Sequence, residues 1–235
     1  MLPKIQYPTF DVTIPSTETK IKIRPMLVKE EKILLMAKQS ESRKDVIDAV
    51  KQIVNNCTVS ENVNVEKFTL FDLEYMFIKI RAISISNIAK VSYRDSEDDK
   101  VYDFDVDLDK VELTKASSNI NIDLGSNLSI QLRYPAISLY SDREFFDLPE
   151  DKMFDRILSS AIEKIFEGDK VYSFETSTKQ EIQDFINSIP AKHYGKIREF
   201  FAGSPSLNYE LKYTNSAGTE RVIKLTTLDD FFTFV

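Results

Sequence analysis

Residues 21–37, IKIRPMLVKEEKILLMA, change from strand to helix within one short stretch. Two isoleucines alternate with basic residues, as they do on a half-buried strand. Pro25 has no N–H to donate to a ladder, so it ends that strand. A helix is then predicted over residues 28–39, and the charged residues 29–32 are interpreted as its solvated side. The apolar face of this helix holds Ile33, Leu34 and Ala37.

The residues in front of this stretch supply a partner strand. Apolar and polar side chains alternate from Ile5 to Ile14, and the turn-forming residues 15–17 follow. Alternation then resumes at Ile21. We therefore expect an N-terminal β-hairpin that leads directly into the first helix.

A second amphipathic helix is predicted after Ser42, which forms a capping pair with Asp45. Its apolar residues recur at helical spacing up to Cys57, and it ends near residues 55–56. Cys57 lies on the apolar side and has no histidine or basic neighbour to lower its pKa. We interpret it as a buried hydrophobic residue without chemistry.

Thr69 and Asp72 are candidate caps for a third helix, residues 70–83. This helix is apolar on most of its circumference, so several neighbours or a partner chain must bury it. We predict it to be the centre of the N-terminal half. Tyr75 and Phe77, on this helix, are candidate partner-binding residues.

Beyond Asn87 the hydrophobic period changes to two, which indicates a β-rich middle segment. Strands are predicted at residues 101–113, 120–124 and 128–133, and loops at 94–100 and 115–119. The first of these strands sends Tyr102, Phe104, Val106 and Leu108 to one face and Asp103, Asp105, Asp107 and Asp109 to the other.

The helical period returns after Pro135. The predicted elements are a helix at 151–166, a strand at 171–174, helices at 177–189 and 192–202, a hairpin formed by 207–213 and 222–225, and a short apolar tail at 228–235. Together the elements predict an α+β fold. We expect an N-terminal α+β domain, residues 1–138, and a C-terminal helical domain with a terminal β-hairpin, residues 139–235.

Composition narrows the possible functions. The chain has 235 residues, of which 42% are hydrophobic, and this favours a folded protein over a disordered one. The formal net charge of -7 disfavours nucleic acid as a partner. No apolar run approaches the roughly 20 residues that cross a bilayer, and the first residues resemble no signal peptide. A cytoplasmic protein is expected.

Cofactor chemistry finds little support in the residue counts. One cysteine forms no internal disulfide, one histidine makes no imidazole metal site, and the five glycines form no phosphate-binding loop. We therefore predict no cofactor, no metal and no catalytic residue.

Two chemical alternatives remain open. The first is a hydrolase that uses an acidic pair or uses His193 as a base with Ser188 or Ser204, although no nucleophile motif surrounds these residues. The second is a calcium-binding module built on the aspartates at 103–109. That row lacks the central glycine and the final glutamate of an EF-hand, and a solvated strand face explains it more simply.

The aromatic end of the chain, Phe231, Phe232 and Phe234, must be buried somewhere, because it would otherwise expose an apolar patch. Two arrangements are open: a short terminal helix docked on the protein's own core, or an anchor inserted into another subunit. The three phenylalanines are therefore candidate partner-binding residues.

Several segments resemble the baseplate hub and hub-assembly proteins of T4-like bacteriophages. The resemblance rests on YPTFDVTIPST, the strand and helix of residues 19–37, NNCT, FDLEYMFIKIRAIS, FINSIP, KIREFF and LDDFF. It runs nearly end to end, apart from residues 88–139. The resemblance implies a non-enzymatic role in tail morphogenesis, as a hub subunit or as a chaperone of hub assembly. The implied partners are other hub proteins or tape-measure proteins, in the cytoplasm of the infected bacterium or in the virion.

Overall fold

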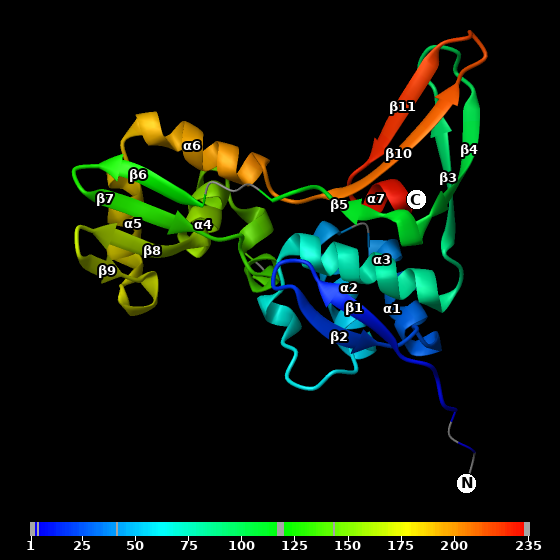
Figure 1. Ribbon diagram of the computed structural model, residues 1–235, viewed down its shortest axis with the longest axis horizontal. Helices are drawn as coiled ribbons and strands as arrows, with labels where there is room; N and C mark the ends of the chain where they lie inside the picture. The colour runs from blue at the N-terminus through cyan, green and yellow to red at the C-terminus, as the bar shows by residue number, and fades with distance from the viewer. Residues whose placement is uncertain (1–2, 4, 41, 117–119, 143, 233–235) are drawn as a thin grey trace. The chain divides into compact units, whose positions relative to one another are not determined.

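The computed structural model describes residue 3 and residues 5–40, 42–116, 120–142 and 144–232 (Figure 1). Helices and small antiparallel sheets alternate along the chain, which confirms the predicted α+β class. Among the described residues no helix is both long and apolar enough to span a bilayer. The chain forms two compact units: Met1–Thr114 with Ser206–Val235 is unit 1, and Lys115–Pro205 is unit 2.

This division differs from the expected boundary after residue 138. The C-terminal hairpin returns to the N-terminal part, where Leu207 pairs with Leu113. Thr114 N–H donates to Ser206 O at 2.9 Å, so the chain leaves and re-enters unit 1 at one place. Such long-range strand pairing is invisible to local periodicity, and it makes unit 2 an insertion within unit 1.

Unit 1 contains three small antiparallel sheets and four α-helices among its described residues. The sheets are β1–β2, β3–β4 and β11–β10–β5. Its elements are β1 (Phe10–Ile14), β2 (Thr19–Ile23), α1 (Val28–Ser40), α2 (Arg43–Cys57), η1 (Val65–Lys67), α3 (Leu70–Ser84), β3 (Ile88–Arg94), β4 (Val101–Asp107), η2 (Leu108–Lys110), β5 (Glu112–Leu113), β10 (Leu207–Thr214), β11 (Glu220–Leu225) and α7 (Leu228–Phe231).

Helix α3 forms the core of unit 1, as its sequence predicts. Thr69 and Asp72 make a reciprocal capping box at its start. Leu73, Met76 and Ile80 on α3 are at most 1% exposed. The helix packs against α2 and β1, and β5 and β10 lie against it as well.

Unit 2 packs helices against one four-stranded antiparallel sheet of order β6–β7–β8–β9. Its elements are β6 (Asn121–Gly125), β7 (Leu128–Leu132), η3 (Ile137–Ser141), η4 (Phe145–Asp147), α4 (Glu150–Ala161), β8 (Ile162–Glu167), β9 (Lys170–Tyr172), η5 (Phe174–Thr176), α5 (Lys179–Ser188) and α6 (Ala191–Ala202). Its core includes Ile122, Ile130, Leu158, Ile165, Ile197 and Phe200.

The predicted helix at residues 151–166 is wrong in its second part. Helix α4 ends at Ala161, and the chain continues directly into β8. Ile162 and Ile165 fit the helical spacing, but both pair with β7, opposite Leu132 and Ile130. The β-branched isoleucines suit a buried strand, and the pairing partner decides between the two structures. The predicted strand at 101–113 is likewise interrupted by η2.

The stretch that opens the fold contains a buried ion pair. Arg24 is 5% exposed and Glu30 is 0% exposed, and Arg24 Nη2 lies 3.0 Å from Glu30 Oε1. Glu30 also accepts the Leu27 N–H at 2.9 Å. Burial disfavours the charged carboxylate, but these hydrogen bonds hold the pKa of Glu30 below its ordinary value. The interpretation of Glu30 as part of a solvated face is therefore wrong.

Breaking this pair should destabilise unit 1. The variant Glu30→Gln leaves Arg24 buried without a countercharge, which costs about 3–5 kcal/mol of unfolding free energy. The double variant Arg24→Met with Glu30→Leu should lose much less than the sum of the two single changes. Urea denaturation followed by circular dichroism measures these differences.

The matched control is Asp11→Asn, because Asp11 pairs with Lys22 at 3.4 Å on the exposed surface. This control should change the unfolding free energy by less than about 1 kcal/mol. Equal losses for Glu30→Gln and Asp11→Asn would contradict the importance of the buried pair.

Candidate functional site

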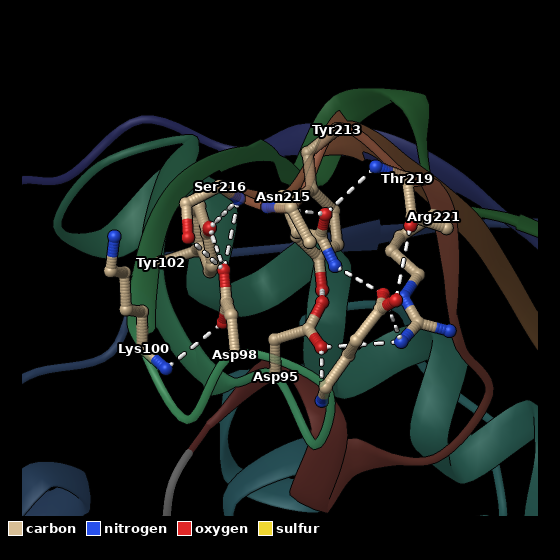
Figure 2. Close-up of polar contacts among 11 residues, drawn as sticks. Asp95, Asp98, Lys100, Tyr102, Tyr213, Asn215, Ser216, Thr219 and Arg221 are labelled. Carbon is tan, nitrogen blue, oxygen red and sulfur yellow. Dashed lines mark hydrogen bonds and ion pairs between the residues drawn. The ribbon is translucent and has the colours of Figure 1, made fainter.

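The densest polar cluster of unit 1 lies where two hairpins meet. The loop between β3 and β4 supplies carboxylates, and the turn between β10 and β11 supplies most of the donors (Figure 2). The tips of these hairpins lie together, at the end that points away from α1, α2 and α3 (Figure 1). We name this cluster the hairpin clamp. Its residues are Asp95, Glu97, Asp98, Tyr102, Tyr213, Asn215, Ser216, Thr219 and Arg221.

Asp95 is the buried centre of the clamp, with 1% of its surface exposed. Tyr213 O–H donates to Asp95 Oδ2 at 2.5 Å, and Arg221 Nη2 donates to Asp95 Oδ1 at 3.3 Å. The Glu97 N–H donates to the same carboxylate at 2.8 Å, closing the turn of the loop. The Tyr213 hydrogen bond is the main cause that holds the pKa of Asp95 below its ordinary value.

Asp98 joins the hairpins at a second point. It accepts the Tyr102 O–H at 2.6 Å and both the N–H and the hydroxyl of Ser216, at 2.9 and 2.8 Å. The hydrogen bond from Tyr102 is the largest cause that lowers the pKa of Asp98. The same bond raises the pKa of Tyr102. Both groups therefore keep the charge states that favour the contact.

Glu97 makes the third connection. It accepts Asn215 Nδ2 at 2.6 Å and Arg221 Nη2 at 3.0 Å. Asn215 is 4% exposed, and its side-chain oxygen accepts the Thr219 N–H at 2.8 Å, which folds the β10–β11 turn. Gly218 completes this turn with a φ of +85°, a conformation that suits glycine.

Aromatic rings support the clamp. The Tyr213 ring centroid lies 4.8 Å from that of Tyr102, 5.3 Å from that of Phe104 and 6.5 Å from that of Tyr93. Such tilted and edge-on pairs add to the burial of each ring. The hydroxyl of Tyr213 thus belongs to the hydrogen-bonded cluster, while its ring belongs to the aromatic contacts that support the cluster.

The electrostatics of the clamp favour a structural role. The pKa values of Asp95 and Asp98 are lowered, while those of Tyr213 and Arg221 are raised. For Tyr213, burial is the main cause. Each shift moves its group away from neutral pH, whereas a general acid or base works best with a pKa near the operating pH. The clamp holds two hairpins in one fixed arrangement.

The sequence predicts a loop at residues 94–100 and a hairpin formed by 207–213 and 222–225, but no pattern in it indicates that the loop meets the turn of the hairpin. Both segments are rich in side-chain oxygen and amide groups: DSEDDK at 95–100 and NSAGT at 215–219. That composition is the only signal available. Nothing in it shows that the two segments meet, because the hydrogen-bonded residues are 114 to 126 positions apart.

The aromatic residues predicted to bind a partner lie on the core of unit 1. Phe77 and Phe231 are each 1% exposed, and the Phe77 and Phe232 rings meet edge to face at 5.7 Å. Tyr75 is half-buried, with Lys79 Nζ 5.0 Å from its ring centroid. Phe234 lies outside the described residues. The described part of the tail thus docks on its own unit, and partner binding by these residues stays a prediction.

A cavity of about 110 Å³ lies beside the docked tail, between α2, α3 and the start of α7. Glu74 lines it together with Arg43 and Asp229 among apolar side chains. Burial is the main cause that raises the pKa of Glu74 to about 7, and the charges of Asp229 and Asp230 add to it. Glu74 is thus a group of unit 1 whose pKa lies near neutral pH.

The aspartate row is a strand face. Asp105 lies opposite Lys90 in the β3–β4 register, and Asp103 accepts the Ser92 hydroxyl at 2.6 Å. Asp107 caps η2 by accepting the Asp109 N–H at 3.1 Å. In the described ranges no group of three or more histidines, cysteines, aspartates or glutamates is placed to hold a metal ion.

His193 lies in the first turn of helix α6 in unit 2 and is 8% exposed. Neither of its ring nitrogens has a hydrogen-bond partner in the part of the chain that the structure describes. The Ser188 hydroxyl donates to Phe185 O at 2.7 Å. The structure therefore does not bring His193 together with a serine in the hydrogen bond that activates a nucleophile.

Comparison with known proteins identifies one family. The family described as T4 bacteriophage base plate protein matches residues 7–233, which is nearly the whole chain and includes parts of both units. No curated protein and no solved structure matches the chain significantly.

The clamp predicts an acid-sensitive contribution to stability. Asp95 has a lowered pKa, so its contribution is present above the ordinary value of 3.8 and is lost as pH falls through the folded-state pKa. The variant Tyr213→Phe should lower the melting temperature by about 2–4 °C at pH 7. The variant Asp95→Asn should lose less stability between pH 5 and pH 2 than the wild type does.

Thermal unfolding at each pH measures both effects, and Tyr93→Phe is the matched control. Tyr93 contacts the same Tyr213 ring but is 40% exposed. The variant Tyr93→Phe should therefore have the melting temperature of the wild type. If Tyr213→Phe has the same melting temperature as the wild type, the hairpin clamp does not contribute to stability as we predict.

The raised pKa of Glu74 predicts that its contribution to the free energy of unfolding has the opposite pH dependence. Its pKa is raised from 4.5 to about 7, so the stabilisation is complete below pH 4.5 and is lost as pH rises through 7. The variant Glu74→Gln should be more stable than the wild type by about 1–2 kcal/mol at pH 8, after allowance for solvent screening. The gain should vanish near pH 4.5.

Urea denaturation at pH 5, 6.5 and 8 checks this prediction. The exposed Glu61→Gln serves as the control and should follow the wild type at every pH. A Glu74→Gln gain that is the same at all three pH values would show that titration is not its cause.

Proposed function

The chain belongs to the T4 bacteriophage base plate protein family, and on that premise we propose that it acts in assembly of the baseplate hub. The family itself gives the coarser statement, a structural or assembly role in the phage baseplate. The finer role is that of a hub subunit or of a chaperone that delivers hub components. The family match over residues 7–233 carries the proposal, because it spans the chain rather than a single motif.

The arrangement of polar groups supports a role in binding without a reaction. The hairpin clamp uses its carboxylates to join two hairpins, and the pKa shifts resolved within it lead away from neutral pH. His193, the candidate base of a hydrolase, lacks a hydrogen-bonded nucleophile in the described residues. No observation favours the hydrolase or the calcium-binding alternative.

The clamped hairpins offer a surface for contacts with other phage proteins. Exposed apolar side chains lie along them: Tyr93 on β3, Val101 on β4 and Val222 on β11 are 40%, 53% and 55% exposed. A fixed surface binds with a smaller loss of conformational entropy than a mobile one. We propose other hub proteins or tape-measure proteins as the partners, met in the cytoplasm of the infected bacterium.

Co-expression with the hub and tape-measure proteins of the same phage tests this function. We expect one of these proteins to co-elute with the chain in size-exclusion chromatography. The substitution of Val101 and Val222 by serine should weaken that complex if the hairpin surface takes part. Elution of the wild-type chain alone, with every candidate tested, would overturn the proposal.

Mass spectrometry of purified virions separates the two finer roles. A hub subunit should be found in the finished tail at a fixed ratio to other baseplate proteins. A chaperone should be present in the lysate and absent from the virion.

A further inference from the structure

Helix α1 carries an unusual outer surface. Val28, Leu35 and Met36 are 72%, 56% and 71% exposed. Among the described residues, each other α-helix exposes at most one large hydrophobic side chain. Isolated exposed hydrophobic residues need no explanation, but three on two turns of one helix form a patch.

Helical spacing places these side chains together. Val28, Lys32, Leu35 and Gln39 follow at i, i+4, i+7 and i+11, and Met36 lies beside this stripe. The inner side of the helix is occupied by Glu30 and Ala37, which are 0% and 6% exposed. We name the stripe with its flanking Lys29 the α1 outer face, comprising Val28, Lys29, Lys32, Leu35, Met36 and Gln39.

The α1 outer face stands on a fixed base. The buried Arg24–Glu30 pair joins the helix to strand β2. The Met26 N–H donates to Ser84 Oγ at 2.8 Å, which ties the start of α1 to the end of α3. Helix α2 packs along the other side. The face is therefore pre-organised, which reduces the entropy that a partner must overcome on binding.

The charge on this face differs from that of the whole chain, which is -7. Lys32 is exposed within the apolar stripe and has no ion-pair partner among the described residues. Lys29 is 65% exposed and lies 3.5 Å from Glu30, whose carboxylate is already held by Arg24. The neighbouring Glu31 is exposed and interacts electrostatically with Arg81. An apolar stripe flanked by two exposed lysines complements an acidic, apolar partner.

We propose that the α1 outer face binds an acidic amphipathic helix of another baseplate protein. Apolar side chains of that helix would pack on Val28, Leu35 and Met36, and its carboxylates would pair with Lys29 and Lys32. A second copy of this chain is a poorer occupant, because a twofold contact would place lysines against lysines. The proposal rests on the proposed function and adds to it the chemistry of the partner and the surface that receives it.

A designed peptide provides the first test. The probe is a fluorescein-labelled 18-residue helix with a leucine stripe flanked by glutamates, and the comparison probe has lysine in place of each glutamate. Fluorescence anisotropy should show that the wild-type chain binds the acidic helix at least tenfold more tightly than the basic one. The charge-reversal variant Lys32→Glu should bind the acidic probe more weakly, and the basic probe more tightly, than the wild type does.

Substitution of the apolar anchors tests the surface itself. Leu35→Ser should weaken binding of the acidic probe at least tenfold, whereas Val171→Ser, which removes a side chain of similar exposure from β9, should leave it unchanged. Circular dichroism verifies that both variants fold. Equal binding of both probes, equal effects of both variants, or binding only to anionic phosphatidylglycerol vesicles would overturn the proposal.

A crosslink within the complex with a hub protein separates this inference from the proposed function. Cys57 is the one cysteine of the chain and is 0% exposed, so Gln39→Cys introduces a single accessible thiol. Labelled with a benzophenone, this position should crosslink to the bound hub protein at an acidic segment, and Val171→Cys on β9, which lies in neither proposed surface, provides the comparison. A complex that forms without a Gln39→Cys crosslink and survives Leu35→Ser overturns the α1 site alone. If the chain forms no complex with any hub protein, the proposed function is overturned as well.

Discussion

The buried pair of Arg24 and Glu30 is the constraint on which the start of unit 1 depends. Arg24 follows strand β2 and donates to Glu30 on α1, while its N–H donates to Cys57 O at the end of α2 at 2.9 Å. One residue, through its side chain and its backbone N–H, thereby connects a hairpin with two helices. Both charges are removed from water, so each is tolerable only with the other in place. Both members of this pair lie within residues 19–37, one of the segments on which the family resemblance rests.

The hairpin clamp closes unit 1 in a different way. Its bonds join the β3–β4 loop to the β10–β11 turn after a separation of more than a hundred residues, and Asp95 and Tyr213 lie at the centre. The carboxylates of Asp95, Glu97 and Asp98 find their donors inside the protein, so they are satisfied without a ligand.

Local rules account for most elements, and long-range contacts account for what the sequence did not reveal. The capping box and apolar period of α3 are written in adjacent residues, so they could be predicted. Glu30 lies in a run of lysines and glutamates that is typical of a solvated helix face. It is buried because the chain changes direction near Pro25, which places Arg24 beside it. Ile162 suits a helix or a strand until β7 pairs with it. No periodic pattern in either segment predicts the contact between Asp95 and Tyr213.

The insertion of unit 2 between β5 and β10 sets an order for folding on the ribosome. Residues 115–205 are complete once they emerge, and their sheet pairs only strands from within that range. Unit 1 begins first but finishes last, because β10, β11 and α7 are among the final thirty residues. Until they arrive, α3 lacks its contacts with β10, and part of its apolar surface stays open to the solvent or to other chains. The part of the protein synthesised first thus waits longest for its native neighbours.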